Sequence, residues 1–182
     1  MPRITPVRGK EDVPPEHHNI VDDVVKVFGG VRGPFSIMLK SPKLAERVLP
    51  LVTFFREGSV VEPGLRSHAI LAAVREREAA YVWAAQVNAA RRAGVPETTI
   101  DLLRAKGDPA GLSEDERDII VYTRQLLRTN RVDPAVLERL KNRHGEQWLV
   151  ELTAAANYFG FLSGMVNAFE VPAPPDGDRL PT

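Results

Sequence analysis

The chain has 182 residues, of which 43% are hydrophobic and 26% are charged. This length fits about one domain with a substantial buried core. Its 24 basic and 24 acidic side chains cancel, so no net positive field favours nucleic acid as a partner. The sequence contains no cysteine, which excludes disulfides, thiolate metal sites and thiol nucleophiles.

The pattern along the chain predicts helices between two irregular ends. Residues 1–16 hold four prolines and predict an extended arm, and residues 173–182 predict a flexible tail. Residues 17–172 predict a single helical domain, because no segment alternates with the period of a strand. Apolar spacing, prolines at first-turn positions and terminal glycines predict helices over 17–28, 41–55, 65–76, 79–93, 97–103, a segment ending at 127, 134–144 and 152–169. Ser113 and Glu116 form a capping-box pattern at the start of the segment that ends at Leu127.

The longest uncharged run, Leu152 to Phe169, is long enough to be a membrane candidate. Four polar side chains lie within it and glutamates flank it, so we expect a buried helix of a cytoplasmic protein without a membrane partner. Gly160 and Gly164 have the spacing of residues that allow close contact between helices.

Two polar residues lie on otherwise apolar helical stripes. Ser67 shares a face with Ile70 and Val74, and Gln86 shares a face with Trp83. If the two helices form an antiparallel hairpin, Ser67 and Gln86 both face one apolar space. Their polar atoms would then bind a ligand, or bond to each other or to a backbone carbonyl.

The second helix of this hairpin contains the segment Tyr81-Val82-Trp83-Ala84-Ala85-Gln86, followed by Ala90-Arg91-Arg92-Ala93-Gly94-Val95. These segments resemble the core signature of the carboxymuconolactone decarboxylase and alkylhydroperoxidase-D superfamily, and the resemblance extends over roughly residues 30 to 175. It implies an all-α, single-domain bundle of the alkylhydroperoxidase-D-like type. It also implies a homo-oligomer, commonly a trimer or hexamer, with sites near subunit contacts.

The sequence departs from the family at each proton-carrying position. Gln86 stands at the position of the family's histidine, Val82 at a glutamate, and Ser67 at the glutamate of the preceding helix. The two cysteines of the peroxidase members fall on Ala79 and Val82, so thiol peroxidase activity is excluded. Glutamine and serine do not titrate near pH 7, whereas general acid–base catalysis needs a group that does.

The resemblance therefore implies a cofactor-free enzyme with an altered site, acting on a small, partly apolar carboxylic acid or lactone. The reaction would be a decarboxylation, an isomerisation or a related lyase step in aromatic compound metabolism. Gln86, Ser67 and Tyr81 would stabilise a developing enolate, and His68 or a tyrosine would move the proton. Arg66 would hold a substrate carboxylate; the alternative is that it forms a surface salt bridge. The remaining substrate-binding candidates are Phe35, Met38, Val82, Trp83, Tyr158 and Phe161. The alternative is that the apolar candidates are core residues and that Tyr81 and Tyr158 are core aromatics with their hydroxyls at the rim.

The histidines have alternative interpretations. His68 lies about 100° around the helix from Ser67, and its position favours a partly exposed or subunit-facing side chain over a catalytic one. His17 and His18 follow Glu16, but adjacent residues point apart on a helix and no third ligand is evident, so no metal is expected. His144 precedes Gly145 at a helix end, where a cation is favourable, and is interpreted as structural.

A non-catalytic small-molecule-binding or scaffold protein of the same family is the competing hypothesis. An altered enzyme and an inactive one would both lose the same glutamate and histidine. A helical nucleic-acid regulator is disfavoured, because the chain has no net charge and no clustered basic helix.

Overall fold

A computed structural model of the chain describes residues 2–181, and within them every regular element is helical. The expectation of an all-α protein is confirmed. The chain divides into two compact units. The first comprises the chain up to Gly58 together with Gly164–Pro172, and the second comprises Ser59–Ser163 together with the chain from Ala173 onward.

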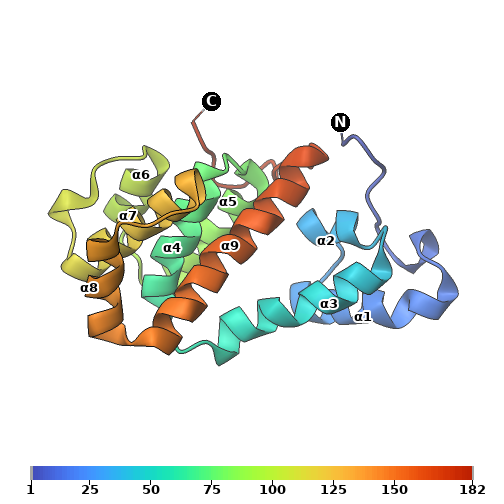
Figure 1. The fold of residues 1–182 in the computed structure, drawn as a ribbon. Coiled ribbons are helices and arrows are strands. Elements are labelled where there is room, and N and C mark those ends of the chain that lie inside the picture. The colour runs from blue at the N-terminus through green and yellow to red at the C-terminus, as the bar shows by residue number, and fades with distance from the viewer. Residues whose placement is uncertain (1, 182) are drawn as a thin grey trace. The chain divides into compact units, whose positions relative to one another are not determined.

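The first unit contains α1 (His18–Phe28), α2 (Gly33–Met38) and α3 (Pro42–Thr53), which continues into a π-helical turn at Phe54–Gly58 (Figure 1). Helices 17–28 and 41–55 were predicted within one or two residues. The sequence did not predict α2, because six residues that begin with Gly-Pro are too few to show a helical period. Before α1, Val7 is buried and its backbone N–H donates to the carbonyl oxygen of Ser36 at 2.8 Å.

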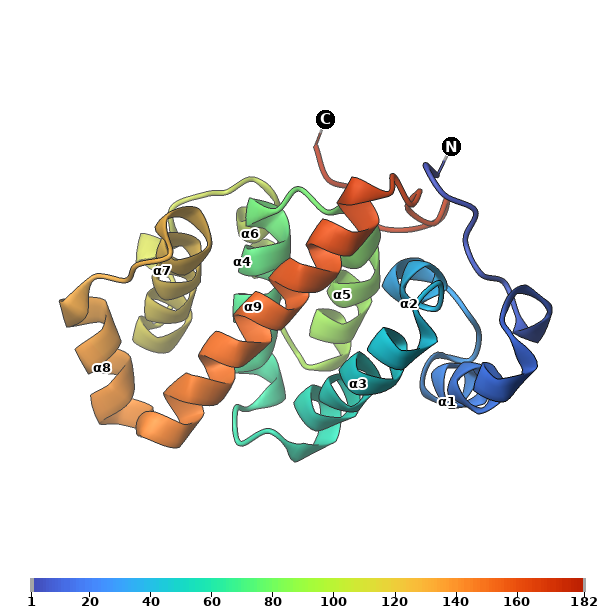
Figure 2. The ribbon, with the colours of Figure 1, turned by 45° about the vertical axis from the view of Figure 1, so that its right-hand side comes forward.

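The second unit contains the remaining helices of the described chain (Figure 2). They are α4 (Pro63–Glu76), α5 (Ala80–Arg92), α6 (Glu97–Arg104), α7 (Glu114–Thr129), α8 (Pro134–His144) and the part of α9 (Glu146–Ala168) that ends at Ser163.

Helix α4 is the central element of the second unit. It packs against α5, α6 and α7, and every residue from Arg66 to Val74 is buried. A helix that is covered on all sides has no face turned to solvent, and the buried stretch of α4 nevertheless includes Arg66, Ser67 and His68. Any polar side chain on α4 must therefore find its partners inside the unit.

The helix ends follow the signals in the sequence. Ser113 and Glu116 form the predicted capping box at the start of α7, and the side chain of Asp133 accepts a hydrogen bond from the backbone of Ala135 at the start of α8. Each cap satisfies backbone N–H groups that have no partner within the helix. Gly94, which follows α5, has a φ of +82°, a conformation that favours glycine.

Helix α9 contributes Trp148, Leu149 and Leu152 to a core cluster with residues of α7 and α8. Gly160 lies close to α7: a Cβ at this position would be 3.0 Å from Cδ1 of Leu127, as its predicted role in close contact requires. The prediction of a close helix contact is wrong for Gly164, because a Cβ at this position would meet no atom within 4 Å. By length and composition α9 is the one helix of residues 2–181 that could cross a membrane, and 56% of its most apolar window is buried inside the structure.

Candidate functional site: the His68–Glu116 pocket

The residues of the resembling hairpin lie on α5 with different exposures. Val82 and Trp83 are buried, whereas Tyr81 and Gln86 are partly exposed. The indole Nε1–H of Trp83 donates to Oδ1 of Asp178 at 3.0 Å. Trp83 is therefore both an apolar core residue and a hydrogen-bond donor within the second unit.

Ser67 lies on α4 and is bonded to its own helix. Its hydroxyl donates to the carbonyl oxygen of Pro63, four residues earlier, at 2.7 Å. This is the backbone partner that the sequence analysis left open. The hydroxyl is thus satisfied without a ligand and without Gln86.

Arg66, the predicted holder of a substrate carboxylate, is only 8% exposed. Its Nη1 donates to the carbonyl oxygen of Val61 at 2.5 Å. Burial lowers the pKa of this guanidinium, and the charge of Glu151 opposes that effect. In the structure Arg66 fixes the chain just before α4.

The aromatic and apolar candidates are divided between the two units. Phe35 and Met38 are buried on α2 in the first unit. Tyr158 and Phe161 lie one turn apart on α9 in the second unit, with ring centroids 6.5 Å apart. Tyr158 is buried, whereas Phe161 is 41% exposed.

The prediction of a partly exposed His68 is wrong, because the side chain is buried and only 3% of the residue is exposed. Its side of α4 is covered by α7, which brings Glu116 to it. Nδ1 lies 2.8 Å from the carbonyl oxygen of Gly64, and Nε2 lies 3.2 Å from Oε1 of Glu116. The Nε2 contact has ion-pair distance but not the alignment of a good hydrogen bond, so Nε2 is a buried polar atom without a hydrogen-bond partner.

These contacts determine where hydrogens must be. A carbonyl oxygen only accepts, so Nδ1 of His68 carries a hydrogen and donates it to Gly64. The other ring nitrogen, Nε2, faces the carboxylate of Glu116. His68 and Glu116 therefore form a buried imidazole–carboxylate pair.

Glu116 is oriented by the capping box. Its Oε2 accepts hydrogen bonds from the Ser113 hydroxyl at 2.7 Å and the Ser113 backbone N–H at 3.1 Å, which leaves Oε1 toward His68. Burial raises the pKa of this carboxyl, but the Ser113 hydrogen bonds and the nearby His68 outweigh burial and lower the pKa. The charged form of Glu116 is thus favoured.

His68 and Glu116 lie in the wall of a pocket of about 410 Å³. The other lining residues come from the start of α4, the segment after α5 and the facing ends of α7 and α8: Glu62, Gly64, Leu65, Ala93, Gly94, Val95, Pro96, Asp115 and His144. The volume falls within the range of small-molecule sites.

A second histidine–carboxylate pair lines the same pocket. Nε2 of His144 lies 3.0 Å from Oδ1 of Asp115, and the imidazole stacks on the Trp148 ring at a centroid distance of 4.0 Å. Trp148 in turn donates its indole N–H to Glu62 at 2.9 Å, which is the main cause of the lowered pKa of Glu62. The pocket wall therefore holds two imidazoles and three carboxylates.

A larger depression of about 820 Å³ lies in the first unit. Its wall contains lysine, arginine and carboxylate side chains but no histidine. The smaller pocket is the stronger candidate site, because it contains a buried titratable group without a hydrogen-bond partner.

Sequence reasoning named His68 but missed Glu116, Asp115 and Glu62. The capping-box pattern identified Glu116 only as a helix cap, and no sequence signal places it beside a residue 48 positions earlier. Within residues 2–181, no three His, Cys, Asp or Glu side chains are arranged to hold a metal ion.

No protein-family model matches the sequence, and a search of curated proteins finds no similar sequence.

Proposed function

We propose that the protein is a cofactor-independent lyase or isomerase that acts on a small, partly apolar lactone or carboxylic acid at the His68–Glu116 pocket. The observation that carries the proposal is the buried imidazole of His68, whose Nε2 has no aligned hydrogen-bond partner and faces a carboxylate in the wall of a 410 Å³ cavity. Histidine is the side chain best suited to exchange a proton near neutral pH.

The two groups of the pair have complementary roles. Glu116, with 22% of its side chain exposed, removes a proton from the carbon beside the substrate carbonyl. His68 donates from Nε2 to the carbonyl oxygen, where negative charge develops as the enolate forms. The hydrogen bond from Nδ1 to Gly64 and the two from Ser113 to Glu116 hold both groups in place during this exchange.

The charges in the wall narrow the substrate class. Glu62, Asp115 and Glu116 would repel an anion, whereas an uncharged lactone carbonyl meets no such penalty. We therefore propose a lactone, or an acid whose carboxylate points out of the pocket. Arg66 does not line this pocket and has no part in the mechanism.

The proposal includes a fold of the alkylhydroperoxidase-D-like type and a homo-oligomer. Support for the fold is the helical pair α4–α5, in which Trp83 and Ala90 of the resembling segments are buried. Support for an oligomer is an exposed stripe on α9 that contains Val150, Ala154 and Phe161 at helical spacing. Light scattering of the purified protein measures the oligomeric state directly.

The enzymatic proposal is tested by substrate enolisation. The protein is incubated in D2O with a panel of small lactones, and deuterium incorporation is followed by NMR. We expect exchange with the wild type and its loss in Glu116→Gln, which keeps the capping-box pattern because glutamine serves at this position. Glu114→Gln is the matched control, since this exposed carboxylate lies in the same helical turn and outside the pocket. Wild-type exchange rates in Glu116→Gln would falsify the assignment.

Non-catalytic binding is the second candidate function. The observation that favours it is that Ser67 and Trp83, at family site positions, already have hydrogen-bond partners within the chain. A ligand from the same panel that raises the melting temperature and is recovered without deuterium would support this candidate against the first.

A further inference from the structure

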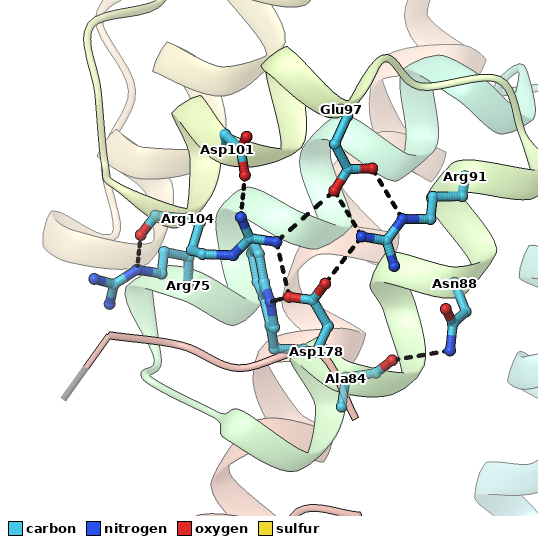
Figure 3. Close-up of polar contacts among 9 residues, drawn as sticks. Arg75, Ala84, Asn88, Arg91, Glu97, Asp101, Arg104 and Asp178 are labelled. Atoms are coloured by element: carbon cyan, nitrogen blue, oxygen red, sulfur yellow. Dashed lines mark hydrogen bonds and ion pairs between the residues drawn. The ribbon is translucent and has the colours of Figure 1, made fainter. Parts of the chain in front are cut away.

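The segment after α9 delivers a carboxylate to α5 and α6. Asp178, with 14% of its side chain exposed, accepts three hydrogen bonds, two from arginines and one from an indole (Figure 3). Trp83 Nε1 and Arg104 Nη2 donate to Oδ1 at 3.0 and 2.8 Å, and Arg91 Nη2 donates to Oδ2 at 3.0 Å. Both oxygens of one carboxylate are thus held by three donors from two helices.

The backbone of this segment fits closely against α5. The N–H of Gly177 donates to the carbonyl oxygen of Pro174 at 3.0 Å, which closes a turn just before Asp178. A Cβ at Gly177 would lie only 2.7 Å from Cβ of Ala84, so a larger residue would displace the segment. The position of the carboxylate therefore depends on a contact that only glycine permits.

Without Asp178, the charges of the two donor arginines are already neutralised by neighbouring carboxylates. Arg91 pairs with Glu97 through two hydrogen bonds, and Arg104 pairs with Asp101. These two guanidiniums and two carboxylates cancel, so Asp178 is one extra negative charge that the site accepts. When it leaves, the Nη2 atoms of both arginines and the indole N–H of the fully buried Trp83 lose an acceptor. An unpaired buried donor is costly, and a carboxylate is the group that satisfies all three.

The aromatic ring adds a second kind of contact. The guanidinium of Arg104 lies over the Trp83 ring, 5.8 Å from its centroid. A cation over an aromatic face is held in a fixed orientation beside the indole N–H. The Arg104 guanidinium of α6 and the Trp83 indole of α5 thus contact each other directly as well as through Asp178.

We propose that Trp83, Arg91 and Arg104 form a binding site for the carboxylate of a small organic acid, and that Asp178 occupies this site in cis until such a ligand displaces it. The proposal concerns residues other than His68 and Glu116 and holds whether or not that pair is catalytic. A tethered carboxylate competes with a free one, so the observed affinity is reduced by the fraction of molecules in which the site is open.

The test uses sodium benzoate as the probe and the indole N–H signals as the readout. The protein has two tryptophans, so Trp83→Phe identifies the Trp83 signal in a proton–nitrogen NMR spectrum. We expect benzoate to shift this signal and to bind Asp178→Asn about tenfold more tightly than the wild type, because the competing charge is gone. Asp176→Asn is the matched control: this exposed aspartate lies two residues away, and the variant should bind benzoate like the wild type.

Three further measurements make the test decisive. Gly177→Val, which keeps the carboxylate but cannot dock beside Ala84, should also bind benzoate more tightly than the wild type. Adding Arg104→Leu to Asp178→Asn should abolish binding, and benzamide, which lacks the charge, should not bind. The proposal is overturned if Asp178→Asn binds no more tightly than the wild type, or if benzamide binds as well as benzoate. Because no readout depends on turnover, failure here leaves the enzymatic proposal unaffected, and Glu116→Gln should bind benzoate normally.

Discussion

Among the carboxylates of helix α7, Glu116 and Asp118 lie two residues apart and differ in their partners and in their exposure. The side chain of Asp118 is 1% exposed and is bound by two arginines of α8. Arg139 donates to both of its oxygens at 2.9 Å, and Arg143 donates to Oδ2 at 2.7 Å. Glu116 instead faces one imidazole and lies at the pocket.

The difference lies in what the partner can do with a proton. A guanidinium stays charged at any ordinary pH, so the Asp118 cluster can only hold α7 against α8. An imidazole is the side chain that exchanges protons most readily near neutrality, so the Glu116 pair is the candidate for proton transfer. The Asp118 hydrogen bonds from Arg139 lower its pKa to about 2, despite the opposing effect of burial. The two carboxylates thus represent a structural and a candidate functional use of similar chemistry on one helix.

The largest expected effect is a loss of stability when Asp118, the structural carboxylate of the two, is removed. Asp118→Ala leaves two arginines without their shared acceptor and should reduce the free energy of unfolding by about 3 kcal/mol. Urea unfolding followed by circular dichroism measures the change. Glu138→Ala is the control, because Glu138 forms an exposed i,i+3 pair with Lys141 and its removal should leave the midpoint unchanged. Equal midpoints for Asp118→Ala and the wild type would show that the cluster does not stabilise the fold.

The next effect is the pH dependence of the same cluster. The folded-state pKa of Asp118, about 2, lies below its ordinary value of 3.8, so its stabilisation is present above pH 4 and is lost as pH falls toward 2. The stability difference between the wild type and Asp118→Asn should therefore shrink by roughly 2 kcal/mol over this interval. Urea unfolding of both proteins at steps from pH 6 to pH 2.5 measures the difference. A difference that stays constant would contradict the lowered pKa.

These properties were not equally predictable from sequence. Helix positions and the caps at Ser113 and Asp133 follow from local spacing, which acts within a few residues. The burial of His68 does not, because it depends on which helix covers that side of α4. The contact between Trp83 and Asp178 joins residues 95 positions apart, and nothing near either residue in the sequence indicates it.

The site was predicted only where residue type alone was informative. His68 was named because it titrates, and its partner was missed because Glu116 also satisfies the local pattern of a helix cap. Ser67 was named because a hydroxyl on an apolar stripe needs a partner, and the structure provides a backbone carbonyl. The sequence pattern thus identifies which side chains need hydrogen-bond partners, whereas the packing of helices determines which residues those partners are.

A smaller effect is expected from the cap that orients Glu116. Ser113→Ala removes the side-chain cap of α7 and should reduce the free energy of unfolding by about 1 kcal/mol. It also removes hydrogen bonding that lowers the pKa of Glu116, so this pKa should rise, as carbon NMR of the labelled carboxyl can measure. Ser113→Thr keeps a hydroxyl cap and serves as the control. Unchanged stability and pKa in Ser113→Ala would mean that the capping box does not position Glu116.

The smallest effect on stability, and the sharpest test of the comparison, is expected for Glu116→Gln. Glutamine maintains the capping box, and its amide can donate to Nε2 of a neutral His68 while Nδ1 still donates to Gly64. The free energy of unfolding should therefore change by less than about 0.5 kcal/mol, in contrast to the large loss in Asp118→Ala. The same variant removes the carboxylate proposed to take the substrate proton, so proton exchange with a substrate should stop while the fold persists. A loss of stability as large as that of Asp118→Ala would show that Glu116, like Asp118, mainly stabilises the fold. The assignment of Glu116 to proton transfer predicts a small change in stability.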